Sequence, residues 1–67
     1  MREASFVKSN KKKWLLFENV LDKKEQLSPD KLSDLYIEIT DDLSYAKTFY
    51  PQSNTAVYLN SIASRAH

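Results

Sequence analysis

Apolar residues in the first third of the chain fall on one side of a helical wheel. Charged residues separate them and take the other side; the apolar set is Phe6, Val7, Trp14, Phe17, Val20 and Leu21. An apolar stripe of this period is typical of an amphipathic helix that buries one face. We expect this helix to cover about residues 3–25, because the polar stretch that follows leads into a new helix start.

The clearest helix start in the sequence is formed by Ser28, Pro29 and Asp30. Serine is a good N-cap, proline suits the first helical position, and aspartate is favoured at the positive end of the helix dipole. From there an almost unbroken apolar stripe continues through Leu32, Leu35, Tyr36, Ile39, Leu43, Ala46 and Tyr50. We expect a helix from Pro29 to about Phe49, because Pro51 disfavours helical geometry at the residue before it.

A third helix is predicted after a short connection, with Ser53 as its cap. Its expected inward face comprises Val57, Leu59, Ile62, Ala63 and Ala66. No segment alternates apolar and polar residues as a half-buried strand would. The sequence therefore predicts an all-α fold, a small three-helix bundle in which an antiparallel helical hairpin is followed by a third helix, and residues 1–67 form a single helical domain.

The two ends of the chain suggest its context. The helical rhythm of residues 61–67 has no glycine, asparagine or proline to end it, so we expect this domain to be the N-terminal fragment of a longer protein. The longest hydrophobic runs lie at 14–17 and 56–59. They are far shorter than the roughly 20 residues that cross a bilayer. No signal-peptide core follows the first residues, so we expect the segment to lie on the cytoplasmic side.

Composition excludes several kinds of site. The chain has no glycine and no cysteine, where ordinary usage gives about five glycines at this length. Glycine-rich phosphate loops, dinucleotide fingerprints, disulfides and cysteine metal sites are therefore excluded. Hydrophobic residues make up 42% of the chain, which is too many for a disordered tail. The net charge of +1 gives no general attraction to nucleic acid.

Acidic residues on the second helix raise the question of a metal site. They recur at helical spacing and comprise Asp30, Asp34, Glu38, Asp41 and Asp42. Carboxylate metal centres on helices usually include histidine as well, and the single histidine is the last residue. We therefore expect a solvated or salt-bridged face, with no metal and no other cofactor. Nucleophilic catalysis is not expected either, because no base and orienting group accompany the serines and threonines.

Basic residues gather in the first half of the first helix at Lys8, Lys11, Lys12 and Lys13. One hypothesis is a peripheral module that uses this face on an anionic membrane surface or, less favoured, on nucleic acid. The preferred interpretation is structural. In a hairpin that turns near Leu27, Lys12 lies level with Asp42 and Lys13 with Asp41, so these candidate interhelix charge pairs would fix the antiparallel pairing.

The aromatic residues are numerous for so short a chain, at 12% of all residues. Most are expected to fill the core, where large rings bury area efficiently. A smaller group at the end of the second helix is the candidate partner-binding patch: Tyr45, Phe49 and Tyr50. Tyr45 is the reason for this choice, because it lies off the apolar stripe of its helix.

Residues 39–51 and their surroundings resemble a known family. The run from Ile39 to Pro51, residues 35–38 before it, residues 58–60 after it, and the opening residues 1–8 with Trp14 are similar to the N-terminal region of stage II sporulation protein M family members. The residues that carry the resemblance most clearly are Thr40, Asp41, Asp42, Tyr45, Phe49, Tyr50 and Pro51.

The resemblance implies a setting and no catalytic residues. Members are multi-pass integral membrane proteins of bacteria, and this region resembles the soluble segment before their membrane helices. In spore formers the family member acts as a scaffold for peptidoglycan-degrading proteins during engulfment. We therefore expect a non-enzymatic cytosolic domain of a cell-membrane protein that works in protein–protein interaction or complex assembly. Its expected partners are other membrane or cell-envelope proteins, or a second copy of itself, with the membrane reached through the part beyond residue 67.

Overall fold

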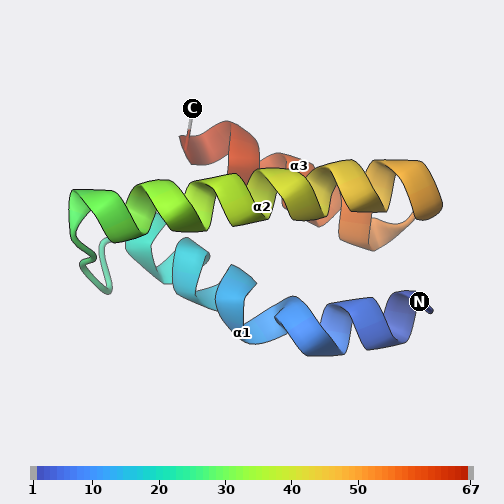
Figure 1. Ribbon diagram of the computed structural model, residues 1–67, viewed down its shortest axis with the longest axis horizontal. Coiled ribbons are helices and arrows are strands. Elements are labelled where there is room, and N and C mark those ends of the chain that lie inside the picture. Colours follow the sequence, from blue (N-terminus) through green and yellow to red (C-terminus); the bar gives the residue numbers. More distant parts are fainter. Residues whose placement is uncertain (1, 67) are drawn as a thin grey trace.

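The computed structural model describes residues 2–66, which form the three helices α1 (Glu3–Leu21), α2 (Pro29–Phe49) and α3 (Asn54–Ala66). These residues contain no strand, so the predicted all-α fold is confirmed. In Figure 1, α1 bends near its middle and runs antiparallel to α2, and α3 turns back behind α2. The molecule measures 32 × 21 × 18 Å, and α2 and α3 form its most extensive helix contact.

Helix α1 ends four residues earlier than the expected end at about residue 25. After Leu21 the chain turns at Lys23, whose φ of 62° lies in the left-handed region. The backbone N–H of Lys23 donates to the Val20 carbonyl at 3.1 Å, and that of Lys24 donates to the Asn19 carbonyl at 2.8 Å. This pair of bonds is a Schellman motif, which usually has glycine at the left-handed position. Because the chain has no glycine, this turn could not be predicted from the sequence.

Helix α2 has the predicted bounds, and local chemistry explains both ends. The Ser28 Oγ accepts a hydrogen bond from the backbone N–H of Lys31 at 3.3 Å, with Pro29 at the first helical position. At the other end the Tyr50 N–H donates to the Ala46 carbonyl at 2.7 Å before Pro51 stops the helix. Both ends were predictable because each depends on residues close in sequence.

Helix α3 is capped by Ser53 as predicted, but its buried face differs from the predicted one. The Ser53 Oγ accepts from the Ala56 N–H at 3.1 Å and donates to the Tyr50 carbonyl at 2.7 Å. The side chains buried against the other helices are those of Thr55, Ala56, Leu59, Ile62 and Ala63. Val57 is 68% exposed and Ala66 is also exposed, so the prediction was wrong for both. Val57 lies about 200° around the helix from Leu59, on the side away from α2.

Each helix contributes one fully buried large side chain to the core: Phe17, Ile39 and Leu59. Around them lie the remaining buried apolar residues, which are Phe6, Trp14, Leu35, Leu43, Ala46, Ala56, Ile62 and Ala63. Fully burying a large apolar side chain contributes about 1.5–3 kcal/mol relative to leaving it in water. The domain is therefore stabilised by all three helices together, and α3 is an integral part of the fold.

Candidate functional site

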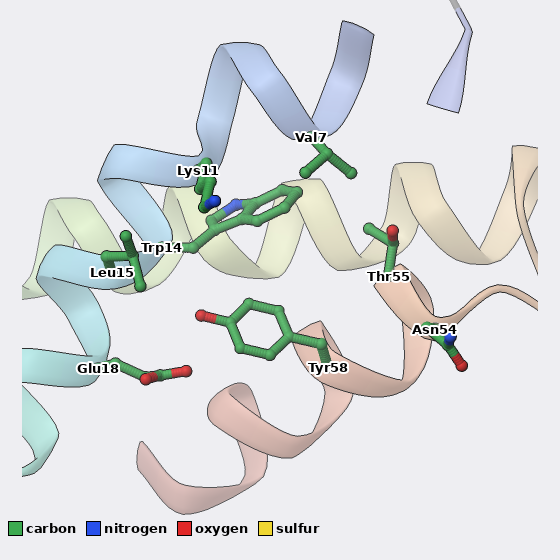
Figure 2. Close-up of a pocket in the computed structure, with 8 residues that line it drawn as sticks. All are labelled: Val7, Lys11, Trp14, Leu15, Glu18, Asn54, Thr55 and Tyr58. Carbon is green, nitrogen blue, oxygen red and sulfur yellow. The ribbon is translucent and has the colours of Figure 1, made fainter. Parts of the chain in front are cut away.

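A groove of about 320 Å³ lies between α1 and α3 (Figure 2). Three residues of α3 form one wall: Asn54, Thr55 and Tyr58. The α1 wall consists of residues on one helical face: Val7, Lys11, Trp14, Leu15 and Glu18. The floor is the contact between the Trp14 and Tyr58 rings, whose centroids are 6.0 Å apart. The groove thus combines an aromatic floor with a cation and a carboxylate on the same wall.

The Tyr58 hydroxyl points from α3 toward the Glu18 carboxylate of α1 (Figure 2). Burial and, after it, a hydrogen bond to Glu18 raise the pKa of Tyr58 well above its ordinary value of 10.0. The phenol is therefore protonated at neutral pH and acts as a hydrogen-bond donor in the groove. Nearby, the Thr55 hydroxyl donates to the Glu3 carboxylate at 3.3 Å, which holds the start of α1 against the start of α3.

One ion pair joins α1 and α2 among the described residues, and it differs from both predicted pairings. Lys13 Nζ lies 2.8 Å from an Asp42 carboxylate oxygen, and the same oxygen accepts from the Trp14 indole N–H at 2.8 Å. Within residues 2–66, Lys12 and Asp41 are in no ion pair, and both are exposed. The pairings Lys12 with Asp42 and Lys13 with Asp41 were therefore wrong, because Asp42 meets Lys13 and the Trp14 indole instead.

The basic face of α1 is smaller than the sequence suggested. Lys8, Lys11 and Lys12 are exposed, whereas Lys13 is half-buried and taken up by Asp42. Lys11 also borders the groove, on the same wall as Glu18. Of these four lysines, Lys8, Lys11 and Lys12 therefore remain for any anionic surface.

The aromatic patch of Tyr45, Phe49 and Tyr50 is contiguous, but two of its rings hold α1 in place. The Phe6 ring stacks on Tyr45 at 4.8 Å and lies 5.8 Å from Tyr50. Tyr45 and Tyr50 are half-buried, and only Phe49 is largely exposed, at 60%. The idea that Tyr45 is free of the core was wrong, because the N-terminal turns of α1 cover the side of α2 on which it lies.

The acidic residues of α2 do not gather into a ligand set. Asp30, Asp34, Glu38 and Asp41 are exposed along the helix, while Asp42 turns toward α1. In the part of the chain that the structure describes, no three acidic or histidine side chains are placed to hold a metal ion. The histidine at position 67 lies outside the described residues.

A second hollow, of about 500 Å³, opens near the turn between α1 and α2. Its lining is mostly apolar and comprises Phe17, Val20, Leu21, Lys23, Pro29, Leu32, Ser33, Tyr36 and Ala66. Lys23 is its single charged residue, so it has less to define a ligand than the groove between α1 and α3.

The comparison with protein families gives one result. The profile of the family described as "Domain of unknown function (DUF8413)" matches residues 4–67. The chain belongs to this family. No curated protein and no solved structure matches it. Among residues 2–66 of this DUF8413 domain, no helix is both long enough and apolar enough to cross a membrane.

Sequence reasoning missed the groove of the DUF8413 domain. Leu15 was the available signal, because it is a large apolar residue that lines the groove and that the three-helix packing leaves 44% exposed. Leu15 sits on the outer side of the stripe formed by Phe6, Trp14 and Phe17. A second, offset apolar position on a helix is weak evidence by itself, since single exposed apolar residues are common on protein surfaces.

Proposed function

We propose that this DUF8413 domain is a non-enzymatic protein-interaction module that binds an amphipathic helix of a partner along the groove between α1 and α3. The single observation that supports the proposal is the composition of the groove. Leu15 and Tyr58 offer an apolar seat above the buried Trp14 ring, and on the same wall Lys11 lies one turn before Leu15 and Glu18 lies one turn after it. Helix-in-groove recognition uses apolar anchors of this kind, and flanking charges set the direction of the bound helix.

The charges define the chemistry of the partner. A helix seated in the groove should present leucine-like side chains to Leu15 and Tyr58, an acidic residue near Lys11 and a basic residue near Glu18. A helix of the opposite direction would place like charges together, which is unfavourable. The proposal thus commits to one occupant and to one orientation.

Trp14 provides the test, because it is the chain's single tryptophan and it lines the groove. We would titrate the domain with a synthetic amphipathic helical peptide that carries a leucine stripe between acidic and basic ends, and follow Trp14 fluorescence. The matched control is the same peptide with its charged ends exchanged. We expect a saturable change in emission for the first peptide and an affinity at least about tenfold weaker for the second.

Two variants make the titration specific to the groove. Leu15→Glu puts a charge at its centre and should abolish the response. Ile37→Glu changes an equally large residue of α2 that is 55% exposed and does not line the groove, so binding should persist. If Trp14 emission responds to neither peptide, or if both variants respond equally, the proposed function is wrong.

The cellular setting in this proposal is the cytoplasmic side of a bacterial multi-pass membrane protein, with membrane or cell-envelope proteins as partners. Its support is the resemblance of residues 39–51 to the stage II sporulation protein M family. Reporter fusions to the N-terminus and to successive loops of the full-length gene product would test it. A product that fractionates without detergent and lacks hydrophobic spans would contradict this setting.

A second candidate function is binding to an anionic membrane surface, favoured by the exposed Lys8, Lys11 and Lys12 in the first half of α1. Each basic residue near such a surface contributes roughly 1 kcal/mol, and salt screens the attraction. Flotation with vesicles of phosphatidylserine and phosphatidylcholine at low and high salt tests it. Binding that is lost when the three lysines are changed to glutamine would favour this function over the groove.

A further inference from the structure

A stripe of five residues runs along the outer side of α1 to the residue that follows it, at alternating spacings of three and four. It consists of Lys8, Lys11, Leu15, Glu18 and Asp22. All are exposed except Glu18, which is half-buried. Lys11, Leu15 and Glu18 also form part of the groove wall, so the stripe is continuous with the proposed binding surface.

The charges along this stripe are of opposite sign on the two sides of its apolar centre. Two cations precede Leu15 and two carboxylates follow it. Leu15 is 44% exposed although the helix buries Trp14 and Phe17 on either side of it. A helix that meets this stripe in the opposite direction needs acids opposite the lysines, an apolar residue opposite Leu15, and bases opposite the carboxylates.

Helix α1 itself meets that requirement. Two copies related by a two-fold axis near Leu15 would place the two leucines against each other and the basic half of each helix beside the acidic half of the other. Such an interface is isologous, so every favourable charge contact occurs twice.

We propose that the partner recognised at this face is a second copy of the chain, bound through antiparallel packing of α1 on α1. In this dimer Lys11 lies beside Glu18 of the partner subunit, and the Leu15 side chain is covered. Asp22 is already paired with Arg65 of its own chain, so Glu18 is the carboxylate of this stripe that meets a lysine of the second copy. This inference rests on the proposed function, because it names the partner of the same surface.

Sedimentation equilibrium over a range of protein concentrations tests the dimer directly. We expect reversible dimerisation of the unmodified chain that weakens as salt is raised. Leu15→Glu should weaken the dimer by at least about tenfold, because it brings two like charges together at the axis. Ile37→Glu, which also adds one carboxylate to an exposed apolar position, should leave the dimer unchanged.

Charge reversal tests the antiparallel arrangement. Lys11→Glu alone and Glu18→Lys alone should each weaken the dimer, because each places like charges opposite one another twice. The double variant Lys11→Glu/Glu18→Lys should regain it. An equimolar mixture of the two single variants should form a heterodimer, since every contact between them is then of opposite sign. Because Glu18 also accepts a hydrogen bond from Tyr58, circular dichroism should first establish that each variant is folded.

The outcomes separate the two proposals. A chain that remains monomeric at millimolar concentration, or a dimer insensitive to Leu15→Glu and to charge reversal, overturns self-association. If such a monomer still binds the amphipathic peptide through Trp14, the proposed function stands with a different partner. Loss of vesicle binding in Leu15→Glu, without any dimer in solution, would likewise overturn self-association and assign the face to a membrane.

Discussion

The Trp14 indole N–H donates a hydrogen bond to the Asp42 carboxylate, with 2.8 Å between Nε1 and Oδ2. The same oxygen lies 2.8 Å from the Lys13 ammonium group. One carboxylate of α2 therefore satisfies the polar atom of a buried ring and pairs with a cation, both on α1. This contact fixes the level at which the two antiparallel helices meet.

Removal of this carboxylate should destabilise the domain more than removal of the cation. In Asp42→Ala the buried indole N–H loses its acceptor, which should lower the free energy of unfolding by about 1–3 kcal/mol. Lys13→Ala removes only a partly exposed ion pair and should cost about 0–1 kcal/mol. Urea denaturation followed by circular dichroism measures both. Asp41→Ala, on the exposed neighbour, is the control; an equal loss for Asp41 and Asp42 would contradict the assignment.

Lys23→Gly should stabilise the protein. A side chain with a Cβ pays about 1–2 kcal/mol in the left-handed region, whereas glycine avoids this cost but has a more flexible unfolded chain. The expected net gain in the free energy of unfolding is about 0.5–1 kcal/mol. Thermal denaturation should show a higher Tm for Lys23→Gly and none of this gain for Lys24→Gly, the adjacent control. A lower Tm for Lys23→Gly would mean that the Schellman turn is not retained.

Tyr45→Ala should destabilise the fold, contrary to the expectation of a free partner-binding residue. Its ring lies 4.8 Å from Phe6 and 4.5 Å from Phe49, so truncation removes aromatic packing that holds the start of α1. We expect a loss of about 1–3 kcal/mol in the free energy of unfolding. Tyr45→Phe retains the ring and should lose less than about 1 kcal/mol. Unchanged stability of Tyr45→Ala would restore the view that this ring is available to a partner.

Alkaline pH should destabilise the domain through Tyr58. Because its pKa is raised in the folded state, the folded protein holds the phenolic proton more tightly than the unfolded chain. The resulting stabilisation is complete below pH 10 and is lost as the pH rises above 10. The free energy of unfolding should then fall by up to about 1.4 kcal/mol per pH unit for this group.

Tyr58→Phe removes this contribution, so its free energy of unfolding should depend less steeply on pH above 10. The raised pKa of Tyr50 contributes in the same direction and remains in the variant. Glu18→Gln removes the neighbouring negative charge but not the burial of Tyr58, and should therefore give an intermediate slope. Identical slopes for the unmodified protein and Tyr58→Phe would show that Tyr58 ionises equally in both states.

Much of the fold could be predicted from residues close together in the sequence. Ser28 and Pro29 start α2, Pro51 ends it, and Ser53 caps α3, because each acts on backbone groups within four positions. The helical period also identified most of the buried face, including Phe17, Ile39 and Leu59. These results follow from local geometry and from the free energy of burying one side of a helix.

Only the tertiary structure decided how the faces meet. The choice of Asp42 over Asp41 as the partner of Lys13, the coverage of Tyr45 by Phe6, and the exposure of Val57 all depend on the angle and level at which helices cross. Those are set by interlocking side chains from separate parts of the chain. The groove has the same origin, since Leu15 and Tyr58 come together only when α3 folds back across α1. The sequence by itself therefore determined the three helices and most of the residues that they bury. The packing of the helices determined which surface remains for a partner.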